Sequence, residues 1–207
     1  MSAEANVSDQ LLRPNGPIKA IAVVAVPPLT NPARQEVIAH ITQGLLRVGC
    51  AVVKHEPPAA LPLEDGLRYD PMKDYRALLD HVVAHVPTRP LWAVGYGEGA
   101  YLALHAGAKH RKVQVLLGIA TPAETLDFST MKRSKKPKFL IHGERDEVCT
   151  LKGLRRFYGQ LSEPRDVAII DSADHAFDGH ASEIADAIEE LLGDFDIAAY
   201  RNWPHEA

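Results

Sequence analysis

One short segment constrains the fold of this chain more than any other. An apolar run at residues 91–94 ends in three spaced glycines, Gly95, Gly97 and Gly99, and passes directly into a helical pattern. This order predicts a buried strand, a sharp turn and a helix, because glycine tolerates the positive φ angles that such a turn demands. A strand that leads straight into a helix is part of a βαβ unit, so the segment favours an α/β fold.

The rest of the chain repeats this alternation of strand-like and helix-like patterns. Apolar runs that predict buried strands lie at residues 18–26, 51–53, 113–119, 139–142 and 167–170. Helical spacing of apolar residues predicts helices within 37–46, 75–86, 151–161 and 184–192. Because crossovers between parallel strands are right-handed, the chain is predicted to be an α/β protein with a doubly wound, mostly parallel sheet and helices on both faces.

Length and composition agree with one globular domain. At 207 residues with 46% hydrophobic side chains, the chain can bury a full core without a second domain. Residues 1–17 are polar and rich in proline and glycine, which predicts a flexible N-terminal arm. The domain is expected to span residues 18–193, and residues 194–207 are expected to form a C-terminal tail.

Charge and cysteine usage narrow the expected surroundings of the protein. The formal net charge of −4 does not favour nucleic acid as a partner. Two cysteines are too few for a disulfide framework, and neither a secretory signal nor an apolar membrane span is recognisable, so we expect a cytoplasmic protein that does not enter membranes. The one basic cluster, at residues 132–138, is interpreted as a solvated loop.

Two titratable residues follow predicted strands downstream of the glycine turn. Asp146 comes after the strand at 139–142, and His175 comes after the strand at 167–170. In a parallel sheet the carboxyl ends of the strands meet at one edge. We therefore expect Asp146 to lie within hydrogen-bond reach of His175 and to orient it as a general base.

With Gly97, Asp146 and His175 in this order, the chain resembles the α/β-hydrolase superfamily, in particular its small, lidless, dienelactone-hydrolase-like serine hydrolases. The resemblance covers roughly residues 18–193 and implies the α/β-hydrolase fold without a cap domain. Residues 92–99 match the nucleophile elbow of that superfamily, and Asp146 and His175 match its acid and histidine positions. The family carries serine or cysteine where this chain has Gly97, so the resemblance implies a triad without its nucleophile.

The loop after the first strand departs from the family in a second way. In related small hydrolases this loop donates an oxyanion-hole amide, whereas here it contains Pro27, Pro28, Leu29 and Pro32. Because proline has no amide hydrogen, fewer donors are expected there. Pro28 and Leu29 are candidate ligand contacts.

The residues on either side of Gly97 each have two interpretations. Glu98 is either a substitute carboxylate in the site or a charge attracted to a helix N-terminus. Tyr96 either offers its phenol to the pocket or packs against the neighbouring strand.

Cys149 opens a helix, where a thiolate is stabilised, yet it is interpreted as a small buried hydrophobe. The acid and histidine cluster within 171–180 is interpreted as a surface loop, so no metal or other cofactor is expected.

These observations support three hypotheses about function. The first is a pseudoenzyme whose open pocket binds a small molecule and which cannot carry out acyl-enzyme chemistry. The second is a non-covalent enzyme, a hydrolase, lyase, isomerase or cyclase, in which His175 and Asp146 form a general-base dyad. The third is an interaction subunit that uses the fold as a surface. Association into a homo-oligomer is compatible with each of them.

Overall fold

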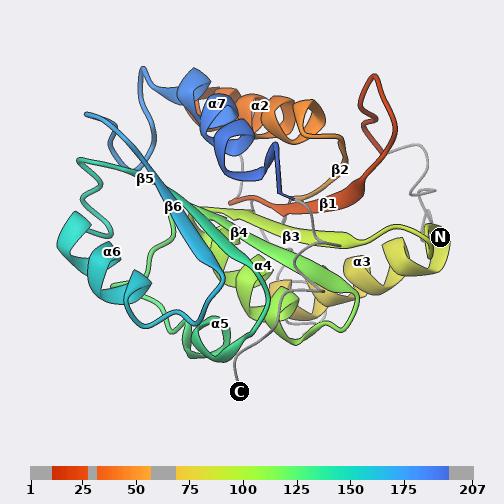
Figure 1. Ribbon diagram of the computed structural model, residues 1–207. Coiled ribbons are helices and arrows are strands. Elements are labelled where there is room, and N and C mark those ends of the chain that lie inside the picture. The colour runs from red at the N-terminus through yellow and green to blue at the C-terminus, as the bar shows by residue number, and fades with distance from the viewer. Residues whose placement is uncertain (1–10, 28–31, 57–68, 196–207) are drawn as a thin grey trace.

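The computed structural model describes residues 11–27, 32–56 and 69–195, and its centre is a six-stranded sheet (Figure 1). All neighbouring strands pair in parallel, in the order β2-β1-β3-β4-β5-β6, which confirms the predicted doubly wound sheet. From β1 the sheet is extended by β2 on one side and by β3 on the other, so the strand order reverses between β1 and β3. The carboxyl ends of β1 and β3 therefore lie at the switch point where open α/β sheets bind ligands. The strands are β1 (Ala20–Ala25), β2 (Cys50–His55), β3 (Leu91–Tyr96), β4 (Val113–Ile119), β5 (Lys138–Gly143) and β6 (Arg165–Ile170).

Helices cover both faces of the sheet (Figure 1). One face packs against α2 (Pro32–Arg47) and α7 (Ala181–Leu192). The other packs against α3 (Pro71–His85), α4 (Glu98–Lys109), α5 (Ser129–Arg133) and α6 (Leu151–Tyr158). The sequence does not indicate α5, because five residues are too few to show a helical period. Within the described residues, no helix is both long and apolar enough to cross a membrane.

Strands β1 and β3 are apolar throughout, and both of their faces are buried. In β1, Ala22 and Val24 contact the α2 and α7 layer, whereas Ile21 and Val23 contact the opposite layer. Each of these side chains is fully buried. Burial on both faces explains why the sequence shows continuous apolar runs rather than alternation.

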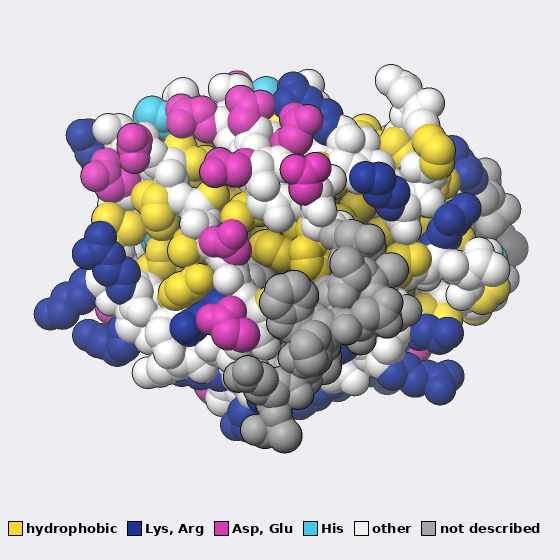
Figure 2. Space-filling view, in the orientation of Figure 1, with side chains coloured by type: hydrophobic (Ala, Val, Ile, Leu, Met, Phe, Trp, Pro, Cys, Tyr) yellow, Lys and Arg dark blue, Asp and Glu magenta, His cyan; other side chains and the backbone are white. Residues whose placement is uncertain are grey.

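The layer formed by α2 and α7 carries an acidic outer surface. Acidic side chains gather over α7 on the face shown in Figure 2, where α7 contributes Glu183, Asp186, Glu189 and Glu190. Arg47 at the end of α2 pairs with Asp186 at 2.8 Å and reaches Glu189 at 3.6 Å. These ion pairs are solvent-exposed, so they orient the two helices and contribute little free energy beside the apolar contacts.

Strand pairing begins earlier in the chain than the sequence indicates. Leu12 lies in the segment expected to be a flexible arm, yet it forms an antiparallel bridge with Val52 of β2. The two backbone N–H···O distances are 3.0 and 2.8 Å. Because β2 is at the edge of the sheet, the bridge partly covers backbone groups that would otherwise face solvent.

Two lysines of the basic cluster at 132–138 are not solvated as the sequence suggested, whereas Arg133 and Lys135 are exposed. The Lys136 ammonium donates to the carbonyls of Gly107 and His110, both at 2.6 Å, at the end of α4. The Lys138 side chain is fully buried and donates to the carbonyls of Lys136 and Ser162 at 2.8 and 2.9 Å. Burial lowers the pKa of both lysines to about 8. The pattern of charges along the sequence does not predict these hydrogen bonds, because most of the acceptors come from distant segments.

We predict that Lys138→Met lowers the free energy of unfolding by roughly 1 to 3 kcal/mol, because two partly buried carbonyls lose their donor. Lys152→Met on the exposed face of α6 is the matched control and should change stability by less than about 0.5 kcal/mol. Urea unfolding at neutral pH measures both. Equal losses in the two variants would contradict a structural role for the Lys138 ammonium.

Candidate functional site

The carboxyl edge of the sheet brings together the residues that the sequence singled out. Gly97 follows β3, Asp146 lies in the loop after β5, and His175 lies in the loop after β6. These positions are far apart in the chain and meet only because all strands are parallel.

The turn between β3 and α4 needs its three glycines for two different reasons. Gly97 has a φ of 55° and a ψ of −128°, and the positive φ strains any residue with a Cβ. Gly95 and Gly99 are required by close approach instead. A Cβ on Gly95 would overlap the backbone of Ala100, and one on Gly99 would overlap the carbonyl of Ala25. The turn therefore presses the first residues of α4 onto β1 and β3.

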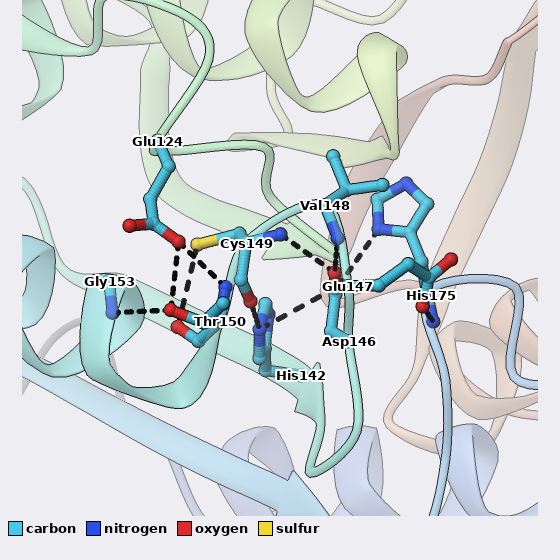
Figure 3. A network of polar contacts seen from close by, with 9 residues as sticks. All are labelled: Glu124, His142, Asp146, Glu147, Val148, Cys149, Thr150, Gly153 and His175. Atoms are coloured by element: carbon cyan, nitrogen blue, oxygen red, sulfur yellow. Dashed lines mark hydrogen bonds and ion pairs between the residues drawn. The ribbon is translucent and has the colours of Figure 1, made fainter.

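Asp146 and His175 form the predicted hydrogen bond. His175 Nδ1 lies 2.8 Å from Asp146 Oδ2 (Figure 3). The other carboxylate oxygen, Oδ1, accepts the backbone N–H groups of Val148 and Cys149, both at 2.8 Å. The Asp146 side chain is fully buried, whereas 18% of the His175 side chain is exposed.

These contacts keep Asp146 ionised. Burial alone would raise the pKa of Asp146, but the hydrogen bonds from His175 and Cys149 outweigh it and hold the pKa below the usual range. Because the carboxylate only accepts hydrogen bonds, Nδ1 of neutral His175 carries the proton. Its other nitrogen, Nε2, is then an unprotonated base.

The free nitrogen of His175 faces the glycine turn. An ideal Cβ on Gly97 would lie 4.0 Å from His175 Nε2 and 4.0 Å from Cγ of Pro27, and no other neighbouring atom of the described residues would be closer. A Cβ at position 97 would therefore make only ordinary van der Waals contacts with the described residues.

A second histidine touches the dyad and was not given a role by the sequence analysis. His142 in β5 is buried, and its Nε2 lies 2.6 Å from the carbonyl oxygen of Cys149 and 3.6 Å from Asp146 Oδ2 (Figure 3). The available signal was a histidine at the end of a strand, directly before the acid loop. Sequence alone does not tell such a histidine from one that only fills the core.

The far end of the acid loop is held by Glu124, which lies after β4 (Figure 3). Its carboxylate accepts the backbone N–H of Thr150 at 2.8 Å and the Thr150 hydroxyl at 2.9 Å. The same hydroxyl accepts the N–H of Gly153 and caps α6. The loop that carries Asp146 is thus attached to neighbouring elements at both ends.

Comparison with solved structures identifies the fold of this chain. No protein-family model and no curated protein matches the chain. A lidless α/β serine hydrolase from Xanthomonas campestris matches with a TM-score of 0.73 at 23% identity, over 95% of this chain and 89% of that one. An α/β serine hydrolase homologue from Coxiella burnetii matches with a TM-score of 0.74 at 23% identity, over 88% and 89%.

The dienelactone hydrolase from Anabaena variabilis also matches, with a TM-score of 0.65 at 22% identity, over 87% of this chain and 88% of that one. The chain has the α/β-hydrolase fold. The likeness extends over nearly the whole length of both chains in each comparison. The segment between β4 and β5 is described in full, and its only helix is the five-residue α5. This segment is therefore too short to contain a cap domain.

The other candidate site residues have different surroundings in the hydrolase fold. Tyr96 is buried and packs against Phe177 with ring centroids 6.4 Å apart, and burial raises the pKa of its phenol to about 12. Glu98 is exposed as the first residue of α4. Pro28 and Leu29 lie outside the described residues.

Cys149 and the acidic segment have local partners in the hydrolase fold. Cys149 is fully buried, and desolvation raises the pKa of its thiol, so it is not poised as a nucleophile. Asp174 accepts the backbone N–H of Asp178, and His180 pairs with Glu183. Among the described residues, no three His, Cys, Asp or Glu side chains are grouped to hold a metal ion.

We predict that the glycines of the turn differ in their tolerance of alanine. Gly97→Ala should cost about 1 kcal/mol, because its Cβ has space and only the positive φ is strained. Gly99→Ala should cost about 3 kcal/mol or more, because its Cβ overlaps the backbone of β1. Thermal and urea unfolding measure both, and a larger loss for Gly97→Ala would contradict this assignment.

We predict that Asp146→Asn destabilises the fold in a pH-dependent way. Since the folded pKa of Asp146 is lowered, the carboxylate contributes stability above its unfolded pKa, and that contribution is lost as pH falls through the folded value. The variant should lose about 2 kcal/mol at pH 7. The difference in free energy of unfolding between the variant and the unaltered protein, measured with urea, should become smaller below about pH 4. A difference that stays constant with pH would contradict a stabilising charge.

Proposed function

We propose that this protein is a hydrolase-fold pseudoenzyme that binds a small molecule beside His175 and does not form an acyl-enzyme. The observation that carries the proposal is the residue facing the base. Gly97 occupies the position of the nucleophile in the turn after β3, and it has no atom that could attack a carbonyl. Nε2 of His175 faces this vacant position.

The surroundings of Gly97 favour a ligand that carries an oxygen acceptor. Gly97 caps α4 without a side-chain hydrogen bond, so the amide of Glu98, the first of the helix, is available to such an oxygen. Pro27, on the opposite side of the vacant position, supplies no amide hydrogen. The site therefore suits binding of a carbonyl or carboxylate group better than strong stabilisation of an oxyanion.

A second candidate function is general-base hydrolysis with water as the nucleophile. The observation that favours it is the space next to Nε2, which can hold a water molecule where a serine hydroxyl would stand. His175 would take a proton from this water as its oxygen bonds to the carbonyl carbon of an ester or lactone. The tetrahedral intermediate would then expel the alkoxide, which takes the proton from His175.

We predict that the protein is not labelled by fluorophosphonate probes, because position 97 has no hydroxyl. The Gly97→Ser variant should be labelled, since a hydroxyl on that Cβ would come to roughly 3 Å from Nε2. Its turnover of aryl esters should be a trace at most, because each missing oxyanion donor costs about 10² to 10³ in rate.

The matched control for this labelling is the double variant Gly97→Ser with His175→Ala, which should react no faster than the unaltered protein. Labelling of the unaltered protein at any serine or cysteine would overturn the proposal. Turnover of an ester or lactone by the unaltered protein, abolished by His175→Ala and reduced by Gly97→Ala, would favour the second candidate. In Gly97→Ala the added methyl group would displace the water.

A further inference from the structure

The buried histidine behind Asp146 has an unusual set of neighbours. His142 is 1% exposed, and its Nε2 lies between two acceptors, the carbonyl of Cys149 at 2.6 Å and Oδ2 of Asp146 at 3.6 Å. Its other ring nitrogen, Nδ1, is also buried and has no hydrogen-bond partner among the described residues.

These neighbours determine the protonation state of His142. A carbonyl and a carboxylate only accept hydrogen bonds, so Nε2 must carry a hydrogen. A second hydrogen on Nδ1 would be a buried donor without a partner, which is unfavourable. Burial lowers the pKa of His142 and outweighs the opposing effect of Asp146. His142 is therefore neutral, with its single N–H directed at the acid loop.

We propose that His142 is a positioning residue that sets the basicity of His175 through Asp146. The inference rests on the proposed function in that His175 is taken as the group that meets the ligand. The side chain of His142 donates to the carbonyl of Cys149. The backbone N–H of Cys149 in turn donates to Asp146 Oδ1. Cys149 is thus held at both of its peptide groups, and its amide stays aimed at Oδ1.

This arrangement leaves the second carboxylate oxygen, Oδ2, for His175. With Oδ1 occupied by two backbone amides, the short hydrogen bond of Oδ2 is made to His175 Nδ1. A neutral donor at position 142 orients the carboxylate without cancelling its charge. A cation there would compete with His175 for Asp146 and make the base weaker.

Other titratable groups lie near this pair, and none of them is itself substituted in a variant at position 142. Glu147 accepts the backbone N–H of His175 at 3.4 Å. The Cys149 thiol has its pKa raised by burial and stays protonated. Tyr96 has its phenol pKa raised to about 12, mainly by burial. A substitution at position 142 therefore reaches the His175 imidazole through Asp146.

The test is the pKa of His175, measured by NMR titration of its imidazole signals in the full chain. In His142→Phe the donor is lost, so Cys149 and Asp146 shift and the His175 pKa should fall by about one unit. In His142→Gln the side-chain amide reaches the same acceptors, and the pKa should return to within a few tenths of the original. The control is His110→Phe, because His110 is also a partly buried histidine but lies at the end of α4. This variant should leave the His175 pKa unchanged.

A fall that glutamine rescues supports the positioning role. An unchanged pKa in folded His142→Phe would overturn it, because a residue that only packs would lower the melting temperature without moving the titration. A raised pKa would also overturn it, since it would show that His142 competes for Asp146. If His142→Phe does not fold, His142→Asn replaces it, because its shorter amide cannot reach Cys149 and the same fall is expected. The titration needs no ligand, so failure to bind any small molecule would overturn the proposed function alone.

Discussion

The contact between the first turn of α4 and the ends of β1 and β3 determines the geometry of the whole carboxyl edge. Gly95 and Gly99 allow the helix backbone to reach the strand backbones, and any side chain at either position would push the two apart. Because α4 starts at the switch point of the sheet, this contact aims its N-terminus and Gly97 at the loops after β5 and β6. Those loops can then meet the turn without long insertions.

A buried negative charge organises the loops on the other side of the site. An isolated carboxylate in the core would be very costly, so Asp146 requires donors from its surroundings. It receives two from its own loop and one from His175. The hydrogen bonds that satisfy this charge therefore order the acid loop and hold the histidine loop against it. The base and the open space at Gly97 are arranged by the same interactions that stabilise the fold.

The geometry of the acid and histidine loops does not depend on a side chain at position 97. None of the hydrogen bonds described for Asp146 involves position 97, and the two crowded glycines act through backbone contacts alone. Glycine at position 97 avoids the strain that a residue with a Cβ would meet at this positive φ. Both proposed functions rest on His175 as a base beside Gly97.

The sequence by itself determined most of the order of strands and helices, the glycine turn centred on Gly97 and the pairing of Asp146 with His175. Each of these follows from local period, turn chemistry or position after a strand. Only the tertiary structure decided that Leu12 bridges β2, that Lys138 is buried and that His142 touches the dyad. These facts depend on partners from distant segments, which no local pattern identifies. Burial and pKa likewise follow from packing in three dimensions, because solvation depends on every element around a side chain.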